Sequence, residues 1–232
     1  MTRVKICGLT QRREAKYLNA AGADYAGFVF HPPSKRNVSV SQAQEIADKL
    51  NQNIKRVAVV VSPGIEEVKE INRGGFDILQ IHGNLTREAL AAAKLPVWLA
   101  VNIAGAGELS GRTRELLKLP GELLDRIAGV VVDGAEYGGG NTFGWCESGN
   151  PFGWRGGGTA QGGGLRDGSV KRLLAGRSLI LAGGLSAANV RQGIRLFAPD
   201  VVDVSSGVES DSGQGKSEIK IKEFVERVKN YE

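Results

Sequence analysis

The sequence has few of the residues that build disulfide scaffolds or metal clusters. Its 232 residues include two cysteines, Cys7 and Cys146, and two histidines, His31 and His82. Two cysteines cannot form the disulfide framework typical of a small secreted domain, and two histidines cannot sustain a rich zinc site. A disulfide-rich or zinc-rich protein is therefore excluded.

Long apolar stretches and strong charge are also missing. No run of 18 apolar residues occurs, and the start, MTRVKICGLTQRRE, has too short an apolar core for a signal peptide. Lysine and arginine number 30 against 25 aspartate and glutamate, a net charge of +5. No basic run interleaves with aromatic residues, so we expect no nucleic-acid partner. We expect a soluble cytoplasmic protein without a membrane span.

Short apolar runs recur along the chain, with a helical pattern after most of them. They are rich in β-branched or aromatic residues and lack clean alternation, which is typical of parallel strands covered on both faces. Eight such βα units in about 230 residues favour an α/β fold, a (β/α)8 TIM barrel forming a single domain over 1–232. The predicted strands are 4–7, 25–30, 56–61, 78–82, 97–103, 129–133, 178–183 and 201–206; the predicted helices are 11–21, 41–50, 64–73, 86–94, 113–118, 169–174, 186–196 and 217–229.

In a TIM barrel the active site lies at the carboxyl ends of the strands, so the residues there are the candidates. Lys5 and Cys7 end the first strand on the same face. An ammonium beside a thiol favours the thiolate, which predicts a lowered pKa for Cys7 and a chemical role. The alternative is that Cys7 is a small buried core residue.

A carboxylate and an arginine end two further strands. Asp133 follows an apolar run and is a candidate general acid if partly desolvated, or alternatively a helix cap or loop acceptor. Asp203 is a weaker candidate because it lies deeper in its strand. Arg36, beside Lys35, suits a planar carboxylate or a phosphate, although a solvated loop charge is the alternative.

Glycine-containing turns follow the seventh and eighth strands. Gly183 and Gly184 form the first turn, and Ser206 and Gly207 the second. Glycines allow backbone N–H groups to approach an anion closely, and these two loops form the common phosphate site of TIM barrels. The pair predicts a phosphate-binding site, whereas each alone could be an ordinary turn.

These residues together resemble the phosphoribosylanthranilate isomerase family of tryptophan biosynthesis, a branch of aromatic amino-acid biosynthesis. The similarity runs through nearly the whole chain in the family's order. The matching segments are KICGLT at 5–10, GFVF at 27–30 with SKR at 34–36, LQIHG at 79–83, LAGGL at 181–185 with NV at 189–190, and VDVSSGVE at 202–209.

The resemblance implies an isomerase that converts N-(5'-phosphoribosyl)anthranilate to 1-(2-carboxyphenylamino)-1-deoxyribulose 5-phosphate by an Amadori rearrangement. It implies that Cys7 is the general base, Asp133 the general acid and Arg36 the ligand of the anthranilate carboxylate. The turns at 183–184 and 206–207 would hold the phosphate of this small-molecule substrate. It implies no metal and no cofactor, and a monomer or homodimer.

Departures from the family leave alternatives open. After Asp133 the sequence lacks the family's usual lysine and second aspartate, and about 146–168 form a glycine-rich insertion in the loop after strand six. Lys35 stands where the family commonly has proline. A histidine-pathway aminoaldose isomerase, or an enzyme serving both pathways, remains an alternative, although those relatives have aspartate in place of Cys7. A non-catalytic barrel that binds a phosphorylated ligand is the other.

Overall fold

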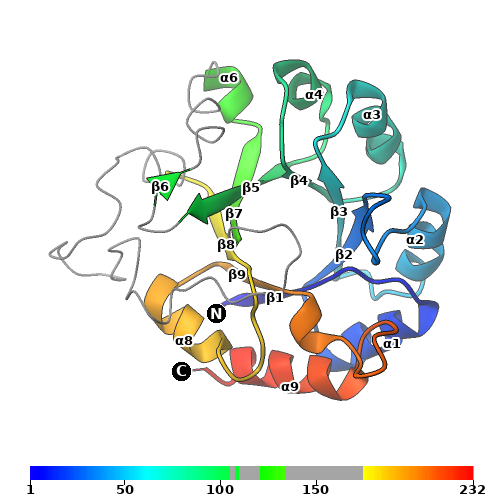
Figure 1. Ribbon diagram of the computed structural model, residues 1–232, viewed down its shortest axis with the longest axis vertical. Helices are drawn as coiled ribbons and strands as arrows, with labels where there is room; N and C mark the ends of the chain where they lie inside the picture. The colour runs from blue at the N-terminus through cyan, green and yellow to red at the C-terminus, as the bar shows by residue number, and fades with distance from the viewer. Residues whose placement is uncertain (105–107, 110–120, 134–174, 232) are drawn as a thin grey trace, which may run out of the picture.

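The computed structural model describes residues 1–104, 108–109, 121–133 and 175–231. Within these ranges, eight parallel strands pair side by side around a ring, and the pairing of β4 with β5 closes it (Figure 1). The predicted (β/α)8 barrel is confirmed. Its strands are β1 (Arg3–Cys7), β2 (Tyr25–Phe30), β3 (Lys55–Val61), β4 (Ile78–His82), β5 (Val97–Ala104), β7 (Ile127–Asp133), β8 (Ser178–Leu181) and β9 (Val201–Val204).

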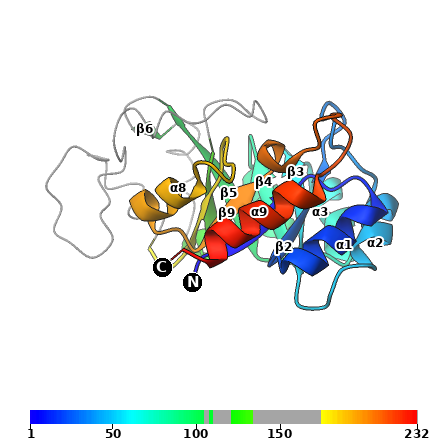
Figure 2. The same ribbon diagram turned by 90° about the horizontal axis from the view of Figure 1, so that it is seen from below.

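Helices surround the ring and cover its outer face. Figure 2 shows α9 lying across the outside of the barrel, and both views place the two chain termini close together. Side-chain caps begin three helices, because Ser39, Thr86 and Ser217 each accept a hydrogen bond from the backbone N–H three residues later. The six longest described helices are α1 (Arg12–Ala21), α2 (Val40–Ala47), α3 (Ile65–Arg73), α4 (Arg87–Ala92), α8 (Val190–Phe197) and α9 (Glu218–Lys229).

Several element boundaries between β8 and the end of β9 differ from the sequence prediction. The helix predicted from residue 186 begins at Val190, because the Ser186 N–H bonds to the Asn189 side chain and forms a turn there. β8 ends at Leu181 because Gly183 and Gly184 adopt left-handed backbone conformations. β9 likewise stops short of the predicted 206.

Two short elements were not predicted. The segment 119–121 reads as a helix breaker, yet Gly121 begins the helix α6 (Gly121–Leu124), since the first turn of a helix tolerates residues that its interior does not. A two-residue strand, β6 (Glu108–Leu109), pairs antiparallel with the end of β5. β6 thus extends the sheet at the end of β5, whereas α6 lies next to α4 and leads into β7.

The core has two layers. One lies between strands and helices; the other fills the barrel interior, where alternate strand residues point inward. The interior layer contains a charged pair, Lys5 and Asp203, among apolar neighbours. Cys7 is the member of this interior layer that ends β1, so it forms part of the floor of a site at the carboxyl ends of the strands. The apolar members are Cys7, Tyr25, Val57, Val59, Ile78, Trp98, Ala100, Val131, Ile180, Ala182 and Val201.

Several predicted features lie outside the described residues. They include the helices at 113–118 and 169–174, Cys146, and the insertion at about 146–168. None of the helices that the structure describes is long and apolar enough to cross a membrane. The same part of the chain contains no group of three or more histidine, cysteine or acidic side chains placed to hold a metal ion.

Candidate active site

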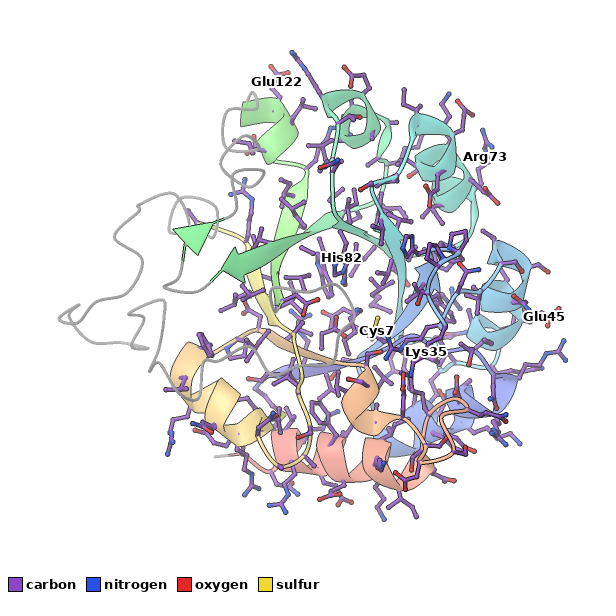
Figure 3. The ribbon with its side chains drawn as sticks, in the orientation of Figure 1. Cys7, Lys35, Glu45, Arg73, His82 and Glu122 are labelled. Atoms are coloured by element: carbon purple, nitrogen blue, oxygen red, sulfur yellow. The ribbon has the colours of Figure 1, made fainter. Side chains whose placement is uncertain are left out.

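A cavity of about 510 Å³ opens at the carboxyl ends of the barrel strands. Six of the seven site residues predicted from the sequence line it, so side chains from distant parts of the chain meet there. Figure 3 shows Cys7 and His82 within the ring, whereas Glu45, Arg73 and Glu122 lie at the periphery. The predicted residues lining the cavity are Cys7, Arg36, Asp133, Gly183, Gly184 and Ser206.

Cys7 ends β1 at the floor of the cavity and is 8% exposed. Gly27 faces it on β2, where a Cβ atom would lie 2.8 Å from the Cys7 Sγ, so this glycine leaves room for the thiol. Burial raises the pKa of the Cys7 thiol, and the nearby Lys5 ammonium lowers it by less. The predicted lowering of this pKa is therefore wrong, because removal from water outweighs the lysine.

Lys5 lies one layer below Cys7 and is fully buried. Its Nζ donates to Oδ2 of Asp203 at 2.6 Å, across the register that pairs these two residues on β1 and β9. Burial alone would lower the pKa of Lys5, but the charge of Asp203 raises it above its ordinary value. Lys5 thus stays charged and places a cation directly beneath the thiol.

Asp203 also lines the cavity, although it lies deeper in its strand than Asp133 does. Its Oδ1 is buried and has no hydrogen-bond partner among the described residues, and the same holds for Oε1 of Gln80. Buried acceptors without partners are costly.

Asp133 is the last residue of β7 and is partly buried. It lines the same cavity as Cys7, from the β7 side of the ring. This position agrees with the prediction of a carboxyl group between the apolar barrel and the open cavity. A carboxyl group and a thiol on two walls of one cavity can serve as a proton donor and a proton acceptor.

Arg36 reaches the cavity from the loop after β2. This loop is folded tightly: the His31 N–H donates to Asn37 Oδ1 at 2.7 Å, and the Arg36 N–H to Ser34 Oγ at 3.1 Å. The Arg36 Nε donates to Oε1 of Glu209 at 2.6 Å, and both side chains are 14% exposed. Arg36 is therefore held in place rather than solvated.

His82 ends β4 and also lines the cavity. Its Nε2 is 2.8 Å from Nε2 of Gln80. Burial lowers the pKa of His82 to about 4, and the Lys5 charge acts in the same direction. The imidazole is therefore neutral near pH 7, and it can accept or donate a hydrogen bond without adding charge to the site.

The two glycine turns lie next to each other at the cavity rim. Gly183 and Gly184 have φ values of 81° and 62°, which a residue with a side chain rarely adopts. Gly207 does not itself line the cavity, whereas the adjacent Ser206 does. Gly207 packs so closely against the Leu185 carbonyl oxygen that a Cβ would collide with it, so Gly207 joins the two turns while Ser206 faces the cavity.

Sequence reasoning missed two charged residues beside the site. Glu209 is the last residue of the motif at 202–209, so the sequence already drew attention to it. Nothing in the sequence indicated its contact with Arg36. Lys216 precedes the predicted last helix and carried no signal. Its Nζ donates to the Ser205 carbonyl oxygen at 3.0 Å, and burial lowers its pKa to about 8, with the Arg36 charge contributing.

Comparisons with known proteins agree on one family. The sequence model described as N-(5'-phosphoribosyl)anthranilate (PRA) isomerase matches residues 4–227. The N-(5'-phosphoribosyl)anthranilate isomerase of Streptococcus gordonii is 37% identical over 231 residues, covering 99% of each chain.

Solved structures give the same result. The phosphoribosylanthranilate isomerase of Thermotoga maritima is 29% identical over 99% of each chain, with a TM-score of 0.76. Another phosphoribosylanthranilate isomerase, in complex with reduced 1-(o-carboxyphenylamino)-1-deoxyribulose 5-phosphate, is 28% identical over 99% of each chain, with a TM-score of 0.72.

Proposed function

Because this chain belongs to the N-(5'-phosphoribosyl)anthranilate isomerase family, we propose that it converts N-(5'-phosphoribosyl)anthranilate to 1-(2-carboxyphenylamino)-1-deoxyribulose 5-phosphate. The observation that carries the proposal is the meeting of Cys7, Asp133 and Arg36 with the two glycine turns around one cavity. The cavity thereby offers a proton acceptor, a proton donor, a carboxylate ligand and a phosphate site to one small molecule.

The proposed reaction needs one acid and one base. Asp133 protonates the furanose ring oxygen, which opens the ring and leaves a Schiff base between C1 and the amine. Cys7, as the thiolate, then removes the proton from C2. The C2–H electron pair forms the C1=C2 double bond and the C1=N π pair moves onto the nitrogen, which gives an enolamine. Tautomerisation of the enolamine yields the ketone. Every step is a proton transfer, so the scheme requires neither metal nor cofactor.

Lys5 supports the proposed base from below. Its ammonium is held by Asp203 and lies beside Cys7, where it partly offsets the cost of forming a buried thiolate.

The two ends of the substrate differ in chemistry and suit different walls of the cavity. The related complex contains a ligand with a carboxyphenyl group at one end and a phosphate at the other. Arg36 offers a forked donor set for the carboxylate. The turns at 183–184 and at Ser206, with left-handed glycines in the first, offer backbone N–H groups for the phosphate.

A fluorescence assay with freshly generated N-(5'-phosphoribosyl)anthranilate tests the proposed activity. The protein is expected to consume the substrate faster than the enzyme-free control, and to leave the aminoaldose substrate of histidine biosynthesis unchanged. Glu45→Gln provides a matched control, because it removes an exposed ion pair with Arg12 far from the cavity. A folded protein that leaves the first substrate at the spontaneous rate would refute the proposal.

A further inference from the structure

We propose that Glu209 is the positioning residue for Arg36: it holds the Nε side of the guanidinium and turns the two terminal nitrogens toward the substrate carboxylate. The inference rests on the proposed function, since it names the group that sets the recognition of the anthranilate end. Glu209 acts through Arg36 and does not contact the reacting atoms.

The contact between the two side chains is fixed on several sides. Glu209 Oε1 accepts from Arg36 Nε at 2.6 Å, and each side chain is 14% exposed. Arg36 also lies against Gly8, the residue after Cys7, where a Cβ would lie 2.5 Å from the Arg36 Cδ. With Nε occupied and the methylene chain resting on Gly8, the end of the guanidinium is left to receive a carboxylate through two parallel hydrogen bonds.

Glu209 itself sits on a stiff support. The 3-10 helix Ser206–Val208 precedes it, and an isolated antiparallel bridge pairs it with Lys216. The carbonyl oxygen of Glu209 accepts from the Lys220 Nζ at 3.1 Å. The backbone that carries the carboxylate is thus held by a bridge and a hydrogen bond, and such support is what a residue needs in order to orient another side chain.

Two lysines prevent this carboxylate from repelling the substrate. Lys35 Nζ donates to Glu209 Oε2 at 2.7 Å, and Lys216 Nζ lies 3.8 Å from Oε1. Burial would raise the pKa of Glu209, but its bonds to Lys35 and Arg36 more than offset this and lower it. Three cations therefore surround one ionised carboxylate, and the group as a whole remains positive toward an anionic ligand.

Lys35 and Lys216 differ in how far solvent screens their interaction with the Glu209 carboxylate. The Lys35 side chain is 63% exposed, so solvent screens its pairing with Glu209, whereas the Lys216 side chain is 1% exposed. Glu45→Ala is the matched control for variants of Glu209, because it removes the exposed ion pair of Glu45 with Arg12, and neither residue lines the cavity.

The test is a double-mutant cycle read with two substrates. Glu209→Ala, Arg36→Ala and the double variant are assayed with N-(5'-phosphoribosyl)anthranilate and with the phosphoribosyl derivative of aniline, which lacks the carboxylate. Glu209→Ala should raise KM for the first substrate by about tenfold or more, as expected for loss of a charged hydrogen bond, with a smaller change in kcat. Glu209→Gln, which keeps an acceptor oxygen, should have an intermediate KM.

Coupling between the two residues decides the proposal. If Glu209 acts through Arg36, adding Glu209→Ala to Arg36→Ala costs nothing further, and Glu209→Ala leaves the aniline substrate unaffected. Equal losses on both substrates, or additive losses in the cycle, would overturn it. If Glu209→Ala does not fold, the same cycle with Glu209→Gln gives the answer. An inactive wild-type protein would instead refute the proposed function, so the two failures are distinguishable.

Discussion

Cys7, the proposed general base, lies at the floor of an apolar barrel, where its environment disfavours the thiolate. In the proposed reaction Cys7 must lose its proton, yet burial raises the pKa of its thiol, and the charge of Asp203 acts in the same direction. Lys5 and Lys216 oppose this effect without overcoming it. In the free protein the thiol is therefore protonated near neutral pH, and only a minor fraction is ready to accept the C2 proton.

Alkylation of Cys7 tests this balance directly. In a Cys146→Ser background, the rate of reaction with iodoacetamide should rise with pH, because the thiolate is the nucleophile. Its midpoint should lie above the value of about 8.5 for an ordinary cysteine, since burial disfavours the charged form. The urea-unfolded protein supplies the reference midpoint. A midpoint below that reference would show that Lys5 outweighs burial.

The meeting of residues at the strand ends was predictable from the sequence, whereas the contact between two side chains of different loops was not. Cys7 and Asp133 end parallel strands, and the strands of a barrel deliver their last residues to one mouth, so their meeting followed from topology. The bond between Arg36 and Glu209 joins residues 173 positions apart through two loops. No local pattern encodes such a contact.

At the scale of elements, the site depends on how closely the turns after β8 and β9 approach each other. Gly207 allows this approach by leaving no side chain against the Leu185 carbonyl oxygen. The strands themselves were predictable, because near-continuous apolar runs are typical of parallel strands covered on both faces. The start of α8 was not, because the side chain of Asn189 folds the preceding residues into a turn.

Gly207→Ala tests the role of this close packing. The added methyl group has to displace the Leu185 carbonyl, so we expect a lower melting temperature and an increased KM for the phosphorylated substrate. Gly121→Ala is the matched control, because a Cβ there meets no atom of the described residues within 4 Å. If both variants bind substrate as the wild type does, the packing of the two turns does not shape the phosphate site.

At the scale of the whole molecule, the barrel encloses titratable groups whose ionisation differs between the folded and unfolded states. His82 is the clearest case, since burial lowers its pKa to about 4 from an ordinary value of 6.5. Between these two values the unfolded chain binds a proton that the folded protein does not. The contribution of His82 to stability is therefore present near neutral pH and is lost as the pH falls from about 6.5 to about 4.

His82→Gln isolates this contribution. Between pH 7 and pH 5, the free energy of unfolding of the wild type should fall by about 2 kcal/mol more than that of the variant, as the shift in pKa requires. Urea denaturation at the two pH values measures both losses. Equal losses in the two proteins would mean that His82 titrates normally in the folded state.

The barrel as a whole was predictable because eight repeated βα patterns specify it, and the family resemblance supplied the substrate and the acid–base roles. Chain topology places the paired charges of Lys5 and Asp203 in the interior, where the attraction between the two charges offsets the cost of removing each from water. The sequence showed both residues but not their pairing. That pairing depends on the β1–β9 register that closes the ring, which links positions 198 apart.

The central claim is tested most directly by a fluorescence assay that follows the consumption of freshly generated N-(5'-phosphoribosyl)anthranilate. The assay compares the wild type, Cys7→Ser and Asp133→Asn at equal protein concentration. The wild type should consume the substrate rapidly. Both variants should be folded and slower by about 100-fold or more, because a hydroxyl is a poor base at neutral pH and an amide cannot donate the acid proton. Turnover at the wild-type rate by either variant would contradict the assignment of that residue as base or acid.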